Sequence, residues 1–125
     1  MKFAENVSSS IRKCRKAHFT APAHERRIIM SSALCEELKK KHRVNALPVR
    51  KDDEVKIMRG AHKGVTGVVS RVNRDKFAIF VDKVQREKNN RQVVQIPINA
   101  SNVMIMKLKM NGSRQRILTR KALPE

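Results

Sequence analysis

Three basic side chains near the middle of the chain are of the types that bind anions. Arg59, His62 and Lys63 lie in or next to a segment bounded by Gly60 and Gly64. Glycine permits positive φ angles and leaves backbone N–H groups uncovered, so a phosphate can approach such a loop closely. Gly64 and Gly67 could instead serve only a tight turn and the curvature of a sheet. We expect both roles, with phosphate contact at the loop tip.

A second group of basic side chains lies near the N-terminus. It consists of Arg12, Lys13, Arg15, Lys16 and His18, followed by Arg26 and Arg27. Residues 1–20 show no apolar periodicity, which predicts an extended arm. Its few apolar side chains cannot offset an ordering cost of about 1–2 kcal/mol per residue. We therefore expect the arm to be disordered in the free protein and to take a fixed path only on a polyanion that supplies counter-charge.

Cys14, His18, His24 and Cys35 are of the types that bind zinc or form a nucleophilic pair. Three, five and ten residues lie between them, without the close CxxC pairing that is typical of structural zinc sites. No acidic residue is placed to orient a Cys–His nucleophile. We therefore expect an inert thiol, histidines that face RNA, no metal, no cofactor and no catalysis. Two cysteines without a signal peptide indicate a reducing compartment.

The overall charge favours a nucleic-acid partner. The 125 residues include 29 Lys and Arg against 11 Asp and Glu, a net charge of +18, and this much self-repulsion opposes compaction unless a polyanion screens it. The chain has neither the run of about 20 apolar residues that a membrane span needs nor a basic helix with a broad apolar face. The Ser- and Arg-bearing first 20 residues faintly resemble a transit peptide, but Glu5 argues against one.

Aromatic content narrows the mode of recognition. There are four Phe, no Trp and no Tyr, so the aromatic platforms of single-strand binders and the cages of methyl-lysine readers are missing. Phe77 and Phe80 fall in an apolar segment, where we expect them to pack in the core. Recognition should therefore depend on phosphates, 2′-hydroxyls and the shape of a folded RNA.

The elements that would position these side chains divide the chain into three parts. We predict a basic N-terminal extension with short helices at 1–49, a small barrel at 50–108 and a basic, helical tail at 109–125. The balanced, apolar residues 51–106 should hold the core. Five short strands with tight turns are expected there, at residues 55–57, 68–72, 77–84, 93–98 and 103–108. Lys88 and Arg91 flank the turn before the fourth strand and complete the candidate RNA-binding set.

Helix signals mark both extensions. Pro22 suits the first position of a short helix, and Ser31-Ser32 look like the N-cap of a helix over Ala33–His42. The tail helix should follow Asn111-Gly112, with Ile117 and Leu118 on its docking side. Lys39–Arg43 could be a nuclear-import signal or a basic helix face toward RNA.

The segment from Val55 to Val69 resembles the KOW motif, which occurs in SH3-like β-barrels of several ribosomal proteins and of transcription elongation factors. The flanks are more specific: residues 12–34, 47–55 and 84–88 resemble the KOW-bearing large-subunit ribosomal protein family, numbered twenty-four in the universal nomenclature and twenty-six in the older eukaryotic one. The resemblance covers nearly the whole chain.

The resemblance implies a mainly β fold, an SH3-like barrel with basic, partly helical extensions, that binds ribosomal RNA without catalysis. It also implies a position near the polypeptide exit tunnel, against the first domain of the large-subunit RNA. Three departures affect loop and tail contacts. The loop around Val65-Thr66 is about a residue shorter than in many eukaryotic members, Ala100 stands where the family often has Pro, and the chain stops at Glu125 without a Lys-rich tail.

These observations together predict a structural constituent of the large ribosomal subunit. Its partners would be large-subunit ribosomal RNA and neighbouring ribosomal proteins, with no membrane and no small-molecule substrate. We expect a cytoplasmic ribosomal location after nuclear or nucleolar passage during assembly. One alternative is a KOW module of a transcription elongation factor, which would need an adjoining partner domain. Another is an SH3- or Tudor-type interaction module, which the missing Trp and Tyr disfavour.

Overall fold

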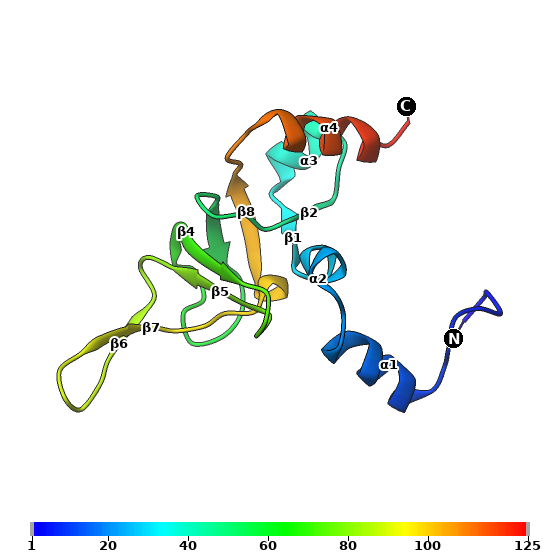
Figure 1. Cartoon of the computed structure of the whole chain (residues 1–125). Helices are drawn as coiled ribbons and strands as arrows, with labels where there is room; N and C mark the ends of the chain where they lie inside the picture. Colours follow the sequence, from blue (N-terminus) through cyan, green and yellow to red (C-terminus); the bar gives the residue numbers. More distant parts are fainter. Residues whose placement is uncertain (1, 125) are drawn as a thin grey trace.

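A single mixed sheet forms the centre of the molecule. The computed structural model describes residues 2–124, and Figure 1 shows the sheet with helices around it. The elements are, in chain order, α1 (Ile11–Phe19), α2 (Ala23–Ile29), β1 (Ser31–Leu34), α3 (Glu36–His42), β2 (Ala46–Pro48), β3 (Glu54–Ile57), β4 (Thr66–Asn73), β5 (Ala78–Val81), β6 (Gln85–Glu87), β7 (Val93–Gln95), the 3-10 turn η1 (Ala100–Asn102), β8 (Val103–Lys107) and α4 (Gly112–Lys121).

The sheet has the strand order β2-β1-β8-β3-β4-β5, and β6 and β7 form a separate hairpin. Register shifts interrupt β4 against β5, between Val69 and Arg71, and β3 against β8, between Glu54 and Val55. Such irregularities bend a strand and increase its twist. The sheet is therefore strongly bent, and the predicted fold class, mainly β and barrel-like with helical extensions at both ends, is confirmed.

The core draws on more of the chain than residues 51–106. Val55, Ile57, Val69, Ile79, Val81 and Ile105 are fully buried, as alternation along their strands requires, but so are Leu34 of β1 and Leu47 of β2. Leu118 of α4 joins the same cluster. The expectation that residues 51–106 hold the core is thus met only in part, because β1, β2 and α4 also contribute to it. The division of the chain at residues 50 and 108 stays a prediction, and the core crosses both positions.

The helix predicted over Ala33–His42 begins later, because its first residues form strand β1 instead. Ala33 and Leu34 pair with Met104 and Ile105 of β8, and the buried Ser32 hydroxyl donates to the Ala100 carbonyl. Ser31-Ser32 are thus not an N-cap. Pairing with a strand far along the chain overrides the local capping signal, and α3 starts only after Cys35.

The later strands are shorter than predicted, and the tail is as predicted. The expected strand 77–84 shrinks to β5, since Phe77 has a φ of +51°, outside the extended region that a strand needs. The expected strand 93–98 keeps only β7, although Ile98 still bridges to Ile79. Helix α4 follows Asn111, whose side chain accepts a hydrogen bond from the Arg114 N–H.

Candidate nucleic-acid interface

The basic cluster near the N-terminus lies on a helix, α1, so the prediction of an extended arm was wrong there. Arg12, Lys13, Arg15 and Lys16 are all exposed, and α1 buries no residue. The helix stands apart from the sheet in Figure 1. Its last turn closes locally, with the Thr20 hydroxyl donating to the Lys16 carbonyl at 2.6 Å. The arm therefore presents four cations to the solvent from a helix that has little packing against the rest of the protein.

The junction of arm and body is built around Phe77. The His18 ring stacks on the Phe77 ring with centroids 4.3 Å apart, and the Arg26 guanidinium lies 4.6 Å from the same centroid. Arg26 also donates hydrogen bonds to the carbonyls of Phe19, Ala21, Arg74 and Asp75. Two residues predicted to bind RNA are thus engaged in protein contacts. RNA contact by His18 and Arg26 stays a prediction.

The expectation that Phe77 and Phe80 pack in the core is met only in part. Phe77 is half-buried beneath His18 and Arg26 rather than enclosed in the core. Phe80 is half-buried too, and the Arg71 guanidinium lies 4.4 Å from its centroid. Each ring therefore packs against the guanidinium of an arginine.

The loop between β3 and β4 has the backbone that its glycines predicted. Gly60 and Gly64 have φ angles of +100° and +92°, where residues with a Cβ are strained. A Cβ at Gly64 would meet nothing within 4 Å, so the outer side of the loop is open. Arg59 and Lys63 are exposed, and His62 is half-buried. The open face and its charges suit an approaching anion.

The backbone donors of this loop are nevertheless occupied. The Gly64 N–H donates to the Ile57 carbonyl at 2.8 Å, and the Lys63 and Val65 N–H groups bond within the loop. The expectation that such groups are left uncovered for a phosphate was wrong for these three residues. Gly67 has the structural role that was considered, because a Cβ there would lie 2.6 Å from both Val81 and Asp82. Anion contact at the loop tip would therefore use side chains.

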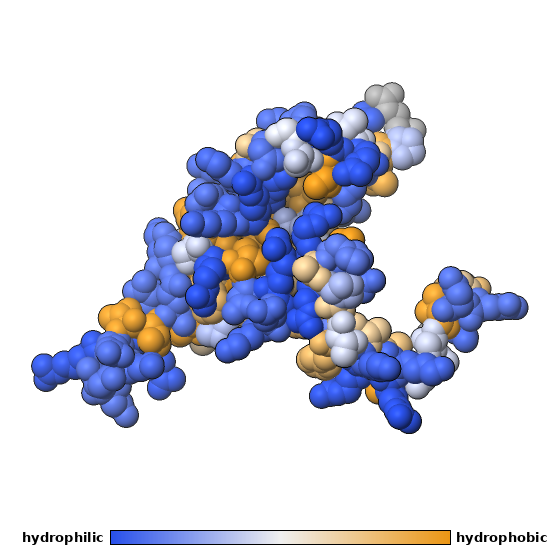
Figure 2. All heavy atoms as spheres, viewed as in Figure 1, coloured by the Kyte–Doolittle hydropathy of each residue, from blue (hydrophilic) through white to orange (hydrophobic). Residues whose placement is uncertain are grey.

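The turn flanked by Lys88 and Arg91 is the tip of the β6–β7 hairpin. It projects from the body (Figure 1), and both side chains are exposed. The Arg91 N–H donates to the Lys88 carbonyl, and Arg91 adopts a φ of +66°. Figure 2 shows that the outer end of the hairpin is hydrophilic and that a hydrophobic patch lies nearer the body. The predicted residues thus form separate groups on the arm, the loop and the hairpin.

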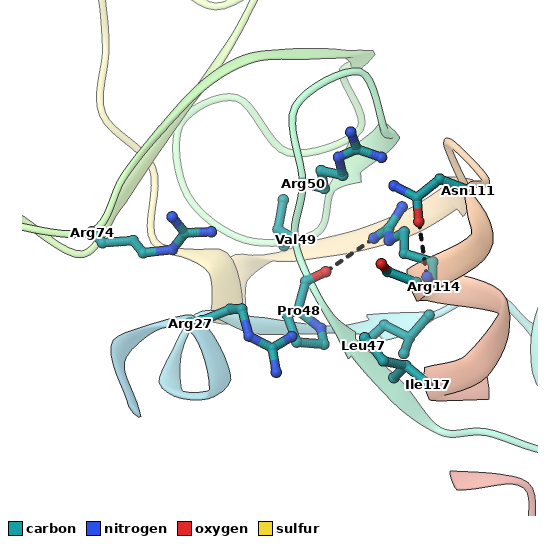
Figure 3. A pocket seen from close by; sticks show the side chains of 10 residues that line it. Arg27, Leu47, Pro48, Val49, Arg50, Arg74, Asn111, Arg114 and Ile117 are labelled. Atoms are coloured by element: carbon teal, nitrogen blue, oxygen red, sulfur yellow. Dashed lines mark hydrogen bonds between the residues drawn. The ribbon is translucent and has the colours of Figure 1, made fainter. Parts of the chain in front are cut away.

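Arg27 belongs to a different site, which sequence reasoning missed. It lines a pocket between α2, β2 and α4 together with Arg50, Arg74 and Arg114 (Figure 3). Four arginines from distant parts of the chain meet there. The sequence holds no local signal for this, since only the fold brings the segments together.

A buried ion pair lies beside this pocket, and sequence reasoning missed it too. Arg114 donates to both carboxylate oxygens of Asp53, at 2.7 Å for Nη2–Oδ2, and further to the carbonyls of Pro48 and Lys109. Asp53 accepts in addition from the backbone N–H groups of Arg50 and Lys109. The pair therefore fixes α4 against the segment between β2 and β3.

The cysteines and histidines weighed as metal ligands are dispersed. Cys14 is exposed on α1, whereas Cys35 is buried beside β8. Within residues 2–124, no three His, Cys, Asp or Glu residues gather closely enough to hold a metal ion. In the same part of the chain, no helix is long and apolar enough to cross a membrane.

Comparison with known proteins gives consistent matches over nearly the whole chain. Residues 8–121 match the family model that describes the eukaryotic ribosomal proteins L26 and their archaeal L24 counterparts. The chain is 53% identical to the large ribosomal subunit protein uL24 of Caenorhabditis elegans, over 98% of this chain and 86% of the relative. It is 43% identical to the protein of the same name from Schizosaccharomyces pombe, over 97% and 96%. The Candida albicans protein is 47% identical, over 96% and 94%.

Proposed function

The chain belongs to the family of eukaryotic L26 and archaeal L24 proteins of the large ribosomal subunit, and we propose that it binds and stabilises folded ribosomal RNA by neutralising phosphates. The observation that carries this proposal is the placement of the charge. Four exposed cations stand on α1, and others stand on the open loop and on the projecting hairpin. Because these groups point away from the body, one RNA with several helices is a better partner than one small ligand.

The chemistry of binding follows from the side chains available. Arg and Lys that neutralise phosphates release condensed counterions, which supplies affinity independent of base sequence. The rings of Phe77 and Phe80 are already covered by Arg26 and Arg71, so base stacking would contribute little. The protein would act as a rigid body with basic projections, which lets phosphate-lined RNA segments approach one another. We propose in addition that the protein lies near the polypeptide exit tunnel and contacts neighbouring ribosomal proteins. The same proposal includes passage through the nucleus or nucleolus during assembly.

The elongation-factor alternative has no observation in its favour. The KOW motif alone is shared by both classes, but the family match extends over residues 8–121 and includes both extensions. No arrangement of side chains described above would support catalysis, and we propose none.

Two experiments test this function. Sedimentation of the endogenous protein in a gradient should show it with the large subunit, and a free pool of low mass would contradict the proposal. For the purified protein and a large-subunit RNA fragment, log affinity should fall linearly with log salt, with a slope of about −0.7 to −0.9 for each phosphate neutralised. A nearly salt-independent affinity would show that phosphate contacts do not dominate.

A further inference from the structure

Charge is unbalanced in the pocket between α2, β2 and α4. Of its four arginines, Arg114 is neutralised by Asp53. Within residues 2–124, the side chains of Arg27, Arg50 and Arg74 make no ion pair or hydrogen bond. No Asp or Glu lines the pocket. Three like charges held in one concavity repel one another and raise the local concentration of anions.

The backbone around these three side chains is held in place. The Arg50 N–H donates to Asp53, and the Arg74 carbonyl accepts from Arg26, the residue that precedes Arg27. Figure 3 shows Arg27, Arg50 and Arg74 set around Pro48 and Val49, with Arg114 on the side of α4. Because the fold and not the ligand brings these segments together, an anion would bind without a large ordering cost.

The lining indicates the class of anion. A guanidinium offers a planar fork of donors that matches phosphate oxygens, and the hydroxyl-bearing Ser113 from the first turn of α4 lines the same pocket. A neighbouring hollow shares Arg27, Pro48 and Ile117 and continues to Arg120 and Lys121. Basic side chains thus follow α4 beyond the pocket, an arrangement that fits a phosphodiester chain better than a single free phosphate.

We propose that this pocket is a phosphate-binding site in which Arg27, Arg50 and Arg74 together hold one phosphodiester of folded RNA, while the groove toward Arg120 carries the next part of its backbone. The inference rests on the proposed function and deepens it, because it adds a site on the body to the three projecting groups. Arg50 and Arg74 were not among the residues predicted from the sequence.

The test compares two triple variants of the full chain that remove the same charge. Arg27→Ala, Arg50→Ala and Arg74→Ala together change the pocket, whereas Lys83→Ala, Lys109→Ala and Arg116→Ala together remove three exposed cations elsewhere. We expect the pocket variant to bind a large-subunit RNA fragment at least about tenfold more weakly than the control, from lost charge-assisted hydrogen bonds. Each single pocket substitution should account for most of that loss, since all three act on one phosphate.

A conservative variant controls for the case in which the triple alanine variant misfolds. Replacing the three arginines by lysine keeps the charge but removes the bidentate fork, so we expect an intermediate loss of about threefold to tenfold. If either pocket variant binds RNA as the control does, the site is refuted while a steep salt dependence of the wild type would still support the proposed function. If the wild type itself does not bind RNA, the proposed function fails.

The source of the phosphate is tested by the arginine side-chain N–H signals in NMR spectra. RNA should shift the signals of Arg27, Arg50 and Arg74 at concentrations where inorganic phosphate does not. Equal shifts by inorganic phosphate would identify a free-anion site and overturn the RNA assignment. Unchanged RNA affinity of the pocket variants, together with lost incorporation into large subunits, would assign the pocket to an acidic partner protein and overturn it as well.

Discussion

Helices α1 and α4 carry four Lys and Arg residues each, yet only α4 belongs to the body of the protein. Helix α4 buries Leu118, which is 4% exposed, and ties Arg114 to Asp53. Helix α1 buries nothing, and Ile11 at its start is 85% exposed. The count of charges therefore does not decide whether a basic segment is part of the fold. One buried apolar side chain and one buried ion pair decide it.

The two helices should contribute to RNA binding in different ways. A helix of nine residues that touches the body through the His18–Phe77 stack in its last turn is marginal in water, so the earlier turns of α1 should form and fray in the free protein. Helix α4 is held in place, and with it the pocket that contains Arg27, Arg50 and Arg74. We therefore expect α4 to contribute a preformed surface and α1 to contribute affinity that depends on ordering with RNA.

The largest expected effect comes from breaking the ion pair of α4. Asp53→Ala leaves the Arg114 guanidinium buried and unpaired, which should lower the free energy of unfolding by about 3–5 kcal/mol. Lys107→Ala is the control, because it removes a partner of Glu54 from an exposed pair at 3.7 Å, worth at most about 1 kcal/mol. Urea unfolding of both variants measures the difference. A loss below that of the control would show that the pair does not hold α4.

The next effect concerns the apolar contact. Leu118→Ala should cost about 2–3 kcal/mol, toward the lower end for buried leucines because Leu118 lies at the margin of the core. Ile11→Ala on α1 is the matched substitution on the other helix, and it should change stability by no more than about 0.5 kcal/mol. Equal losses for the two variants would mean that α1 also packs in the fold.

Gly64 combines features of the two helices. It belongs to the folded body, as α4 does, but it lies in a loop that we propose to face RNA, as α1 does. Gly64→Val places a β-branched residue at a positive φ and should cost about 1–3 kcal/mol, whereas Gly64→Asn should cost less. Because nothing lies within 4 Å of the added Cβ, the cost is backbone strain. Thermal unfolding and incorporation into large subunits should both suffer with Val. Two unchanged readouts would show that the glycine is neither a turn requirement nor a contact.

The contrast between the helices also explains which parts of the structure were predictable. Helix α4 was found because its signals are local, Asn111-Gly112 ahead of it and the adjacent apolar residues Ile117 and Leu118. Strand β1 was taken for the start of a helix because its partners, above all β8, are distant in the sequence. Helix α1 was missed because its apolar side chains are few among basic ones, although Ile11, Cys14 and His18 recur at the spacing of one helix face. The composition predicted a basic surface, but the ion pair of Asp53 with Arg114 and the arginine pocket join residues that only the fold brings together.

The smallest effect on stability should come from removing the arm. Deleting residues 2–17 spares His18 and Phe19 at the junction. The free energy of unfolding should therefore change by no more than about 0.5 kcal/mol. Affinity for a large-subunit RNA fragment should nevertheless fall at least about tenfold, with a shallower salt dependence because four cations of α1 are lost. If the deletion lowered the free energy of unfolding as well as the RNA affinity, the arm would be part of the folded body, which would contradict the comparison.

Amide hydrogen exchange of the free and the RNA-bound protein, followed region by region, tests the central claim most directly. In the free protein, residues 112–121 should be protected together with the sheet, while residues 2–17 exchange at nearly the rate of an unfolded chain. Addition of a large-subunit RNA fragment should protect the arm. Strong protection of residues 2–17 without RNA would contradict the account, because α1 would then be part of the fold.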